Sequence, residues 1–273
     1  MGESAKKILF VSAEILPYLP ESEMAAIGRF LPQGVQERRR EIRSFMPRYG
    51  CINERKNQLH EVIRLSGMNL VVNGVDRQLL IKVASIPAAR IQVYFIDNDD
   101  YFKRKQPFCD ESGKFFEDND ERAIFFARGV METVKKLRWA PDIIHCQGWI
   151  SHLVPVYLKK AYKDDPIFAS SKVVLSLYDD CPEGARFSPE FAKKALFGAV
   201  ESKDLSLLED PTGINLAKTA ARYSDGIILG SDNLSPLLVN YCRDRGMRVM
   251  KYNAKSLASG SYIDEYNDFY DLL

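Results

Sequence analysis

A chain of 273 residues, 46% of them hydrophobic, can bury a full core, arranged as one large domain or two small ones. Its 38 Lys and Arg residues nearly balance its 37 Asp and Glu residues, which argues against a dedicated surface for nucleic acid or an anionic membrane. Five scattered cysteines without a metal-binding spacing, and the lack of a long apolar segment, predict a soluble cytoplasmic protein with reduced thiols.

The first half of the chain alternates short apolar runs with helical patterns. Residues 8–12 form a continuous apolar run, typical of a strand buried on both faces of a parallel sheet. We expect a helix over 25–39, interrupted or bent at Pro32, and then a strand over 42–46. The pair Asn73-Gly74 predicts an antiparallel hairpin inserted at the sheet edge, and the next buried strand is expected at 91–96.

The second half continues the alternation. Residues 118–138 predict the clearest helix, with acids at its start and basic residues at its end. Strands are expected at 141–146, 172–178 and 226–229, and helices are expected to begin at Gly148 and at Ser235-Pro236. This order predicts an α/β fold with a Rossmann-like, doubly wound, mainly parallel sheet and helices on both faces.

The predicted domain organisation is one α/β domain over 1–252, a linker over 253–260 and a C-terminal amphipathic helix over 261–273. The linker assignment rests on the small and polar residues of NAKSLASG. In the tail, Ile263, Tyr266, Phe269, Tyr270 and Leu273 share one helical face, which we expect to pack back on the domain.

Four segments over residues 6–245 resemble bacterial glycogen synthases and plant starch synthases, in the same order. They are KKILFVSAEILPYLPESEMAAIGRFLPQGV, YFIDNDDYFKRKQ, WAPDIIHCQGWISHLVPVYLK and ARYSDGIILGSDNLSPLL. The resemblance implies the N-lobe of a two-lobed GT-B glycosyltransferase, in which the N-lobe binds the acceptor glucan and the C-lobe binds most of the ADP-glucose. We expect this chain to supply the N-lobe only, and its aromatic tail is similar to the helix that closes many family members. A chance amphipathic tail is the alternative.

The resemblance also locates the family's functional positions, and most of them are changed here. The family loop K-T-G-G-L falls on Pro20, Glu21, Ser22, Glu23 and Met24, and the aspartate that follows it corresponds to Ala26. The lysine and glycines of that loop attend the donor phosphates, so proline and acids predict that the chain has lost ADP-glucose binding.

The family block P-D-x-x-H-x-H-D-W-H keeps its first histidine as His145 and its tryptophan as Trp149. Its second histidine, its aspartate and its last histidine are replaced by Gln147, Gly148 and Ile150. The family's later V-H-N strand end corresponds to Leu177, Tyr178 and Asp179. We therefore predict no catalytic residue, and we expect a residual cleft lined by His145, Trp149 and Tyr178.

No other catalytic or metal-binding pattern stands out. His145 and His152 lack a third ligand nearby, so structural roles are favoured over a metal site. The acids at 97–100 and 179–180 could hold a cation, but solvated loop acids are the more common case. We expect no metal and no cofactor.

Three functions remain open. The favoured one is a non-catalytic N-lobe homologue in glycogen or α-glucan metabolism that binds a glucan, a glycogen synthase or another protein. The first alternative is an active glucosyltransferase, from ADP-glucose to α-1,4-glucan, completed by a separate C-lobe partner. The second alternative is a structural homodimer. Transfer requires stabilisation of the departing diphosphate, and the changed loop favours the non-catalytic function.

Overall fold

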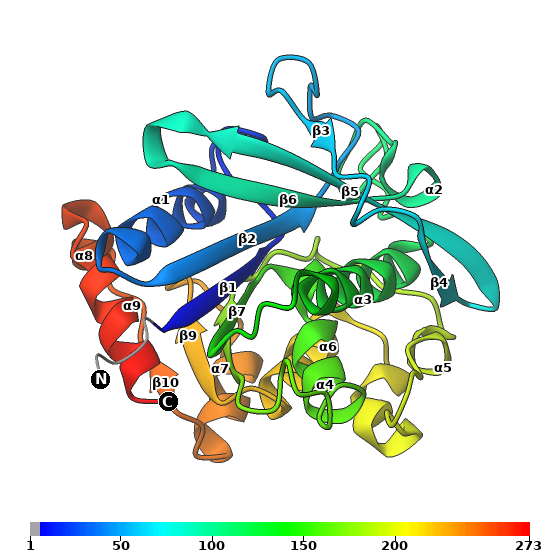
Figure 1. Ribbon diagram of the computed structural model, residues 1–273. Helices are drawn as coiled ribbons and strands as arrows, with labels where there is room; N and C mark the ends of the chain where they lie inside the picture. Colours follow the sequence, from blue (N-terminus) through cyan, green and yellow to red (C-terminus); the bar gives the residue numbers. More distant parts are fainter. Residues whose placement is uncertain (1–5) are drawn as a thin grey trace.

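A mostly parallel sheet forms the centre of the molecule (Figure 1). The structure is a computed structural model that describes residues 6–273, so the first five residues of the predicted domain lie outside it. Its strands are β1 (Lys7–Ser12), β2 (Glu41–Pro47), β3 (His60–Glu61), β4 (Met68–Val72), β5 (Val75–Ile86), β6 (Ile91–Asp97), β7 (Ile143–Gln147), β8 (Lys172–Leu177), β9 (Gly226–Leu229) and β10 (Val249–Met250).

Helices connect most of these strands. The α-helices are α1 (Glu23–Glu37), α2 (Asp99–Phe102), α3 (Asn119–Leu137), α4 (Leu153–Lys160), α5 (Phe191–Lys194), α6 (Gly213–Arg222), α7 (Pro236–Asp244), α8 (Ala254–Ser259) and α9 (Tyr262–Asp271). Shorter 3-10 helices are η1 (Pro87–Ala89), η2 (Trp149–Ser151) and η3 (Ser202–Glu209).

The strand order across the sheet is β10-β9-β8-β7-β1-β2-β6-β5-β3, and β4 pairs with β5 outside that path. Every pair from β10 to β6 is parallel, whereas β5 runs antiparallel to β3, β4 and β6. Asn73 (φ 50°) and Gly74 (φ 74°) make the turn between β4 and β5, in the left-handed region that a tight hairpin requires. The predicted α/β fold and its edge hairpin are confirmed.

Each face of the sheet is covered by its own helices. Helices α3, α4 and α6 pack on one face, and α1 and α9 pack on the other (Figure 1). Because neighbouring strand residues point to opposite faces, Cys146 faces α3 while His145 faces α9. Within residues 6–273, no helix combines the length and the apolarity that crossing a bilayer requires.

Two local expectations need correction. Helix α1 continues through Pro32, so the expected interruption there is wrong, and Ile27, Leu31 and Val35 on either side of the proline are buried on the same face. The expected linker 253–260 contains helix α8 instead. Asn253 caps its start by accepting from the Ser256 N–H, and Gly260 (φ 80°) ends it in the left-handed conformation. The residues that suggest a linker are the caps of this short helix.

The C-terminal helix α9 closes one face of the sheet. Tyr262, Tyr266, Phe269 and Tyr270 are buried in the cluster that α1 forms with β1, β7 and β8. Ile263 and Leu273 are partly buried against the same cluster. Lys6 Nζ, at the start of the described chain, donates to the Tyr270 carbonyl at 2.8 Å.

Candidate functional site

The turn between β1 and α1, residues 20–23, is where the resemblance places the family's phosphate-binding loop. Side chains of the chain itself take up the hydrogen-bonding groups of this turn. Ser22 is the N-cap of α1, and its Oγ accepts from the Ala25 N–H at 2.9 Å. The same hydroxyl donates to Glu14 Oε2 at 2.5 Å. Glu23 adds a carboxylate in the first helical turn. The partial positive charge of this helix end is therefore already compensated within the chain.

The surroundings of this turn are acidic. Pro20 and Glu21 are exposed and line a shallow hollow of about 340 Å³, in which Glu14, Glu21 and Asp110 are the charged lining residues. Glu23 Oε2 accepts from the Tyr252 hydroxyl at 3.1 Å, so the segment after β10 contacts the turn. A phosphate would meet carboxylates here rather than free N–H donors or a cation.

His145 does not line a cleft, contrary to expectation. Its Nε2 lies 2.7 Å from Ser176 Oγ, and its Nδ1 lies 2.8 Å from the Tyr270 hydroxyl. Burial lowers the pKa of His145 to about 3, which keeps the ring neutral at physiological pH. The strand alternation of β7 turns this side chain towards α9, where it joins the sheet to the C-terminal helix.

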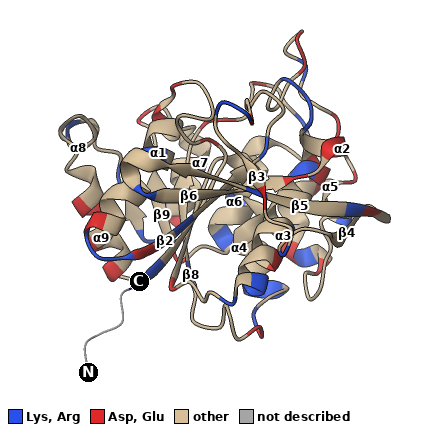
Figure 2. Ribbon diagram, turned by 45° about the horizontal axis from the view of Figure 1, so that its top comes forward, with Lys and Arg blue, Asp and Glu red and all other residues tan. Residues whose placement is uncertain are grey.

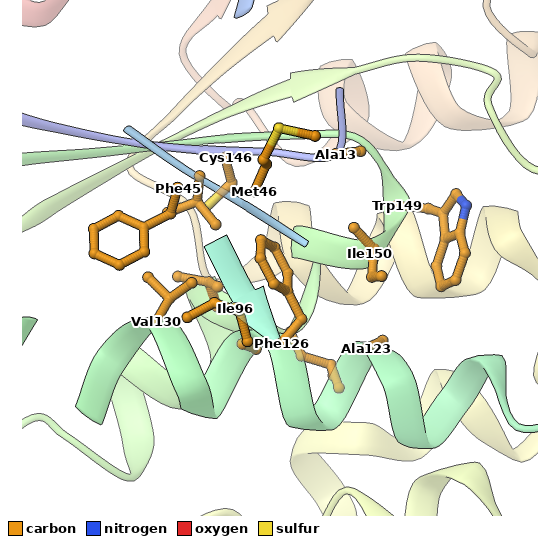
Figure 3. Packing of buried hydrophobic residues seen from close by; sticks show 14 of the residues in the cluster. Ala13, Phe45, Met46, Ile96, Ala123, Phe126, Val130, Cys146, Trp149 and Ile150 are labelled. Carbon is orange, nitrogen blue, oxygen red and sulfur yellow. The ribbon is translucent and has the colours of Figure 1, made fainter. Parts of the chain in front are cut away.

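Trp149 is also placed in the core rather than in a cleft. Its ring packs against Phe108, Phe115 and Phe187, with ring centroids 5.1 to 5.5 Å away. Its backbone N–H donates to Asp180 Oδ2 at 2.7 Å. Ile150 is fully buried and points towards Phe126 of α3 (Figure 3). Trp149 therefore lies in the core and not in the expected residual cleft, because three aromatic rings surround it.

Gln147 and Gly148 complete the changed block. Gln147 is buried and donates from Nε2 to the Met24 carbonyl at 2.6 Å, which links β7 to the first turn of α1. Gly148 has φ 85°, and a Cβ at this position would lie 2.4 Å from the Ala13 Cβ and 3.3 Å from Asp180 Oδ2. The backbone therefore has no room for the family's aspartate at position 148.

A larger hollow opens where β8 ends, and we call it the β8 hollow. It has a volume of about 750 Å³ and is lined by His152, by residues 178–186, and by parts of 212–217 and 234–238. Tyr178 is the only one of the three expected cleft residues that lines it, and Asp179 lies beside it. This position, at the carboxyl ends of parallel strands, is where α/β folds commonly bind ligands.

Several polar groups in the β8 hollow lack protein partners. Neither ring nitrogen of His152 nor the Tyr178 hydroxyl has a hydrogen-bond partner within residues 6–273, although both residues are buried. Burial lowers the pKa of His152 to about 3 and raises the pKa of Asp180 to about 7. Buried polar groups without partners cost free energy, so a ligand whose hydroxyl groups reached these atoms would be stabilised here.

The sequence pattern favours a structural role for His152 and indicates Asp180 only as one possible cation ligand. The signal for the hollow is weak, because its lining comes from His152 and three further segments that only the fold brings together. Within the described residues, no group of three or more His, Cys, Asp or Glu side chains is placed to hold a metal ion. Asp97 instead pairs with Arg48 at 2.9 Å and with Lys82 at 3.1 Å.

Comparison with known proteins identifies the family of the chain. The family model of the starch synthase catalytic domain matches residues 7–236. The chain belongs to this family. It is 36% identical to the glycogen synthase of Chlorobium limicola over 235 residues, which cover 83% of this chain and 48% of that enzyme. It is 32% identical to the glycogen synthase of Chlorobaculum parvum over 279 residues, which cover 100% of this chain and 56% of that enzyme.

A solved structure shows the same fold. The catalytic domain of starch synthase IV from Arabidopsis thaliana, bound to ADP and acarbose, superposes with a TM-score of 0.72 at 16% identity. The match covers 91% of this chain and 51% of that chain. The chain thus spans about half the length of the curated relatives it matches, and it corresponds to their N-terminal lobe.

Proposed function

We propose that this starch synthase N-lobe binds an α-glucan in the β8 hollow and does not itself transfer glucose. The observation that carries the proposal is a contrast between the N-terminus of α1 and the β8 hollow. The helix end that the family resemblance assigns to phosphate is capped by Ser22 and bordered by Glu21 and Glu23. The β8 hollow, by contrast, keeps buried hydrogen-bonding groups without partners among the described residues.

The charge of the β8 hollow favours a neutral ligand. Asp179, Asp180 and Glu183 line it, and its cation Arg186 is paired with Asp210 at 2.5 Å. A diphosphate would be repelled by these acids, whereas sugar hydroxyls can donate to carboxylates and accept from a tyrosine or a protonated acid. A volume of about 750 Å³ lies within the size range of small-ligand sites.

The absence of transfer is supported by position 148. A catalytic aspartate cannot be accommodated beside Ala13 and Asp180, and Gln147 is held by the Met24 carbonyl. These contacts weaken the alternative of an active glucosyltransferase completed by a separate C-lobe, because they belong to this lobe.

The binding test is a titration with maltoheptaose, followed by the melting temperature and by calorimetry. We expect the melting temperature to rise at millimolar sugar, since a ligand that binds only the folded state stabilises it. Tyr178→Phe removes one hydroxyl from the hollow and should weaken binding about fivefold, the effect of one hydrogen bond. Tyr49→Phe is the matched control, because the Tyr49 hydroxyl is also buried without a partner within residues 6–273 but lies outside the hollow.

The catalytic test is ADP release from ADP-glucose and glycogen, with and without lysate of the native organism. We expect no release above the blank from the purified protein. Sustained turnover would contradict the non-catalytic proposal. An unchanged melting temperature with maltoheptaose would contradict the glucan part. Light scattering and capture experiments would then decide between a homodimer and a protein partner.

A further inference from the structure

A second hollow lies at the opposite end of the parallel strands, far from the β8 hollow in the topology. It has a volume of about 610 Å³ and opens where β2 and β6 begin. We call it the arginine hollow. It is lined by Gln36, Arg39, Arg40, Glu41, Ile42, Arg43, Arg90, Ile91, Gln92 and Tyr94. Figure 2 shows the run of basic residues on the chain between α1 and β2.

The charges of this hollow are not balanced from within. Glu41 is its one acidic lining residue among those described, and its Oε1 accepts from Trp139 Nε1 at 2.5 Å. Arg40 pairs with Asp271 at 2.5 Å. Within residues 6–273, Arg39, Arg43 and Arg90 have no carboxylate within ion-pair distance. Arg39, Arg43 and Arg90 therefore line one concave surface without an ion pair within residues 6–273.

Arg43 is held in place by its neighbours. Its Nη1 donates to the Tyr94 hydroxyl at 3.0 Å, and its guanidinium lies 5.1 Å from the Trp139 ring centroid. Its Nε is buried and has no hydrogen-bond partner in the described chain. A guanidinium held in this way loses little entropy when it binds an anion.

The backbone provides an independent observation. Arg39 (φ 64°) and Arg90 (φ 54°) both adopt the left-handed conformation, just after α1 and η1 respectively. Glycine and asparagine favour this conformation, and arginine adopts it at a cost in free energy. Arg138 (φ 51°) has the same conformation after α3 but does not line the hollow. Arg39 and Arg90 are distinguished by lining the same concave surface.

We propose that the arginine hollow binds the phosphate group of a small phosphorylated molecule. The planar fork of arginine matches two phosphate oxygens, and a volume of about 610 Å³ suits a compact ligand. Gln36, Gln92 and the Tyr94 hydroxyl can contact the rest of that ligand. A long polyanion is disfavoured because Glu37 lines the adjoining hollow and Asp271 lies at Arg40.

The test measures binding of two probes, inorganic phosphate and glucose 6-phosphate, by calorimetry and by thermal melting. Glucose and sodium chloride at matched ionic strength are the controls. We expect both phosphates to raise the melting temperature at about 10 mM, and the two controls to leave it unchanged. Tighter binding of glucose 6-phosphate than of inorganic phosphate would show that the hollow also contacts the sugar. Equal binding of the two probes would show that the hollow recognises the phosphate group alone.

The location is tested by the double variant Arg39→Gly and Arg90→Gly. Glycine removes the charges and suits the left-handed backbone, so this variant should fold at least as well as the parent. We expect it to bind phosphate at least about tenfold more weakly. Arg138→Gly is the matched control and should bind like the parent.

Three results would overturn the proposal. One is the absence of a phosphate effect beyond that of chloride. Another is phosphate binding that survives in the double variant. The last is binding of a single-stranded RNA by a parent protein that does not bind either phosphate probe.

Discussion

Gly148 is the residue whose environment most limits a return to the family pattern. Its φ is 85°, and a Cβ added there would lie only 2.4 Å from the Ala13 Cβ, so backbone and packing each oppose any other residue. We expect Gly148→Ala to lower the free energy of unfolding by about 2–5 kcal/mol, from backbone strain and overpacking together. Urea denaturation measures this change.

Gly113→Ala separates the two causes. Gly113 has nearly the same φ, 84°, but a Cβ there would meet no atom within 4 Å. We expect it to cost only about 1–2 kcal/mol, the strain alone. Equal costs at the two positions would show that the contact with Ala13 is unimportant. Gly148→Asp should be worse still, because its carboxylate would lie beside Asp180.

The contribution of Asp180 to stability changes with pH in the opposite direction to that of most acidic residues. Its pKa is raised by burial to about 7, whereas an unfolded aspartate titrates near 3.9. Between these values the folded state holds a proton that the unfolded state has released. This residue therefore lowers stability as pH rises from about 4 to about 7.

Asp180→Asn should remove that loss, since an amide oxygen can still accept from the Trp149 N–H. We expect the variant to gain stability over the parent by up to about 1.4 kcal/mol per pH unit across this window, and to keep a constant advantage above it. Denaturation midpoints from pH 4 to 8.5 provide the measurement. Asp179→Asn, at the exposed neighbour, should show no such trend.

At the scale of elements, the contact between Tyr270 and His145 joins α9 to β7. Tyr270→Phe removes the hydroxyl 2.8 Å from His145 Nδ1 and leaves a buried ring nitrogen without this partner. We expect a loss of about 1–3 kcal/mol. Tyr270→Ala also leaves a cavity and should cost about 3–5 kcal/mol.

Tyr252→Phe is the control for these variants, because its hydroxyl bonds Glu23 at an exposed site. Its effect should stay within about 0.5 kcal/mol. A Tyr270→Phe variant as stable as the parent would show that the contact does not hold α9 to the sheet.

The sequence is sufficient to predict most helices and strands. It is not sufficient where helix caps or tertiary packing determine the local structure. The apolar runs of β1, β6 and β8 and the Asn73-Gly74 turn follow local rules, and all four are confirmed. Helix α8 resembles a linker in sequence, because its two caps are also common loop residues. His145 and Trp149 resemble cleft residues because the sequence does not tell which face of a strand or loop meets another element. The β8 hollow depends on segments spread between His152 and Leu238.

At the scale of the whole molecule, two buried histidines make the free energy of unfolding depend on pH in the acidic range. Burial lowers the pKa of both His145 and His152 to about 3, from about 6.5 in the unfolded chain. Below pH 6.5 the unfolded state binds protons that the folded state does not, so both residues destabilise the fold as pH falls.

His152→Gln should remove one of these contributions. We expect the fall in stability from pH 6.5 to 4.5 to become shallower by up to about 1.4 kcal/mol per pH unit. Urea denaturation across this range checks it. His60→Gln, at an exposed position, should leave the slope unchanged. An unaltered slope in His152→Gln would mean that this ring binds a proton in the folded protein as readily as in the unfolded chain.

The contact between Lys6 and the Tyr270 carbonyl also has a consequence for engineering. It brings the two ends of the described chain side by side (Figure 1). A short peptide can therefore join residue 6 to residue 273 without stretching the fold, and new termini can be opened at the Asn73-Gly74 turn. The same closeness allows the lobe to be inserted into a surface loop of a host protein.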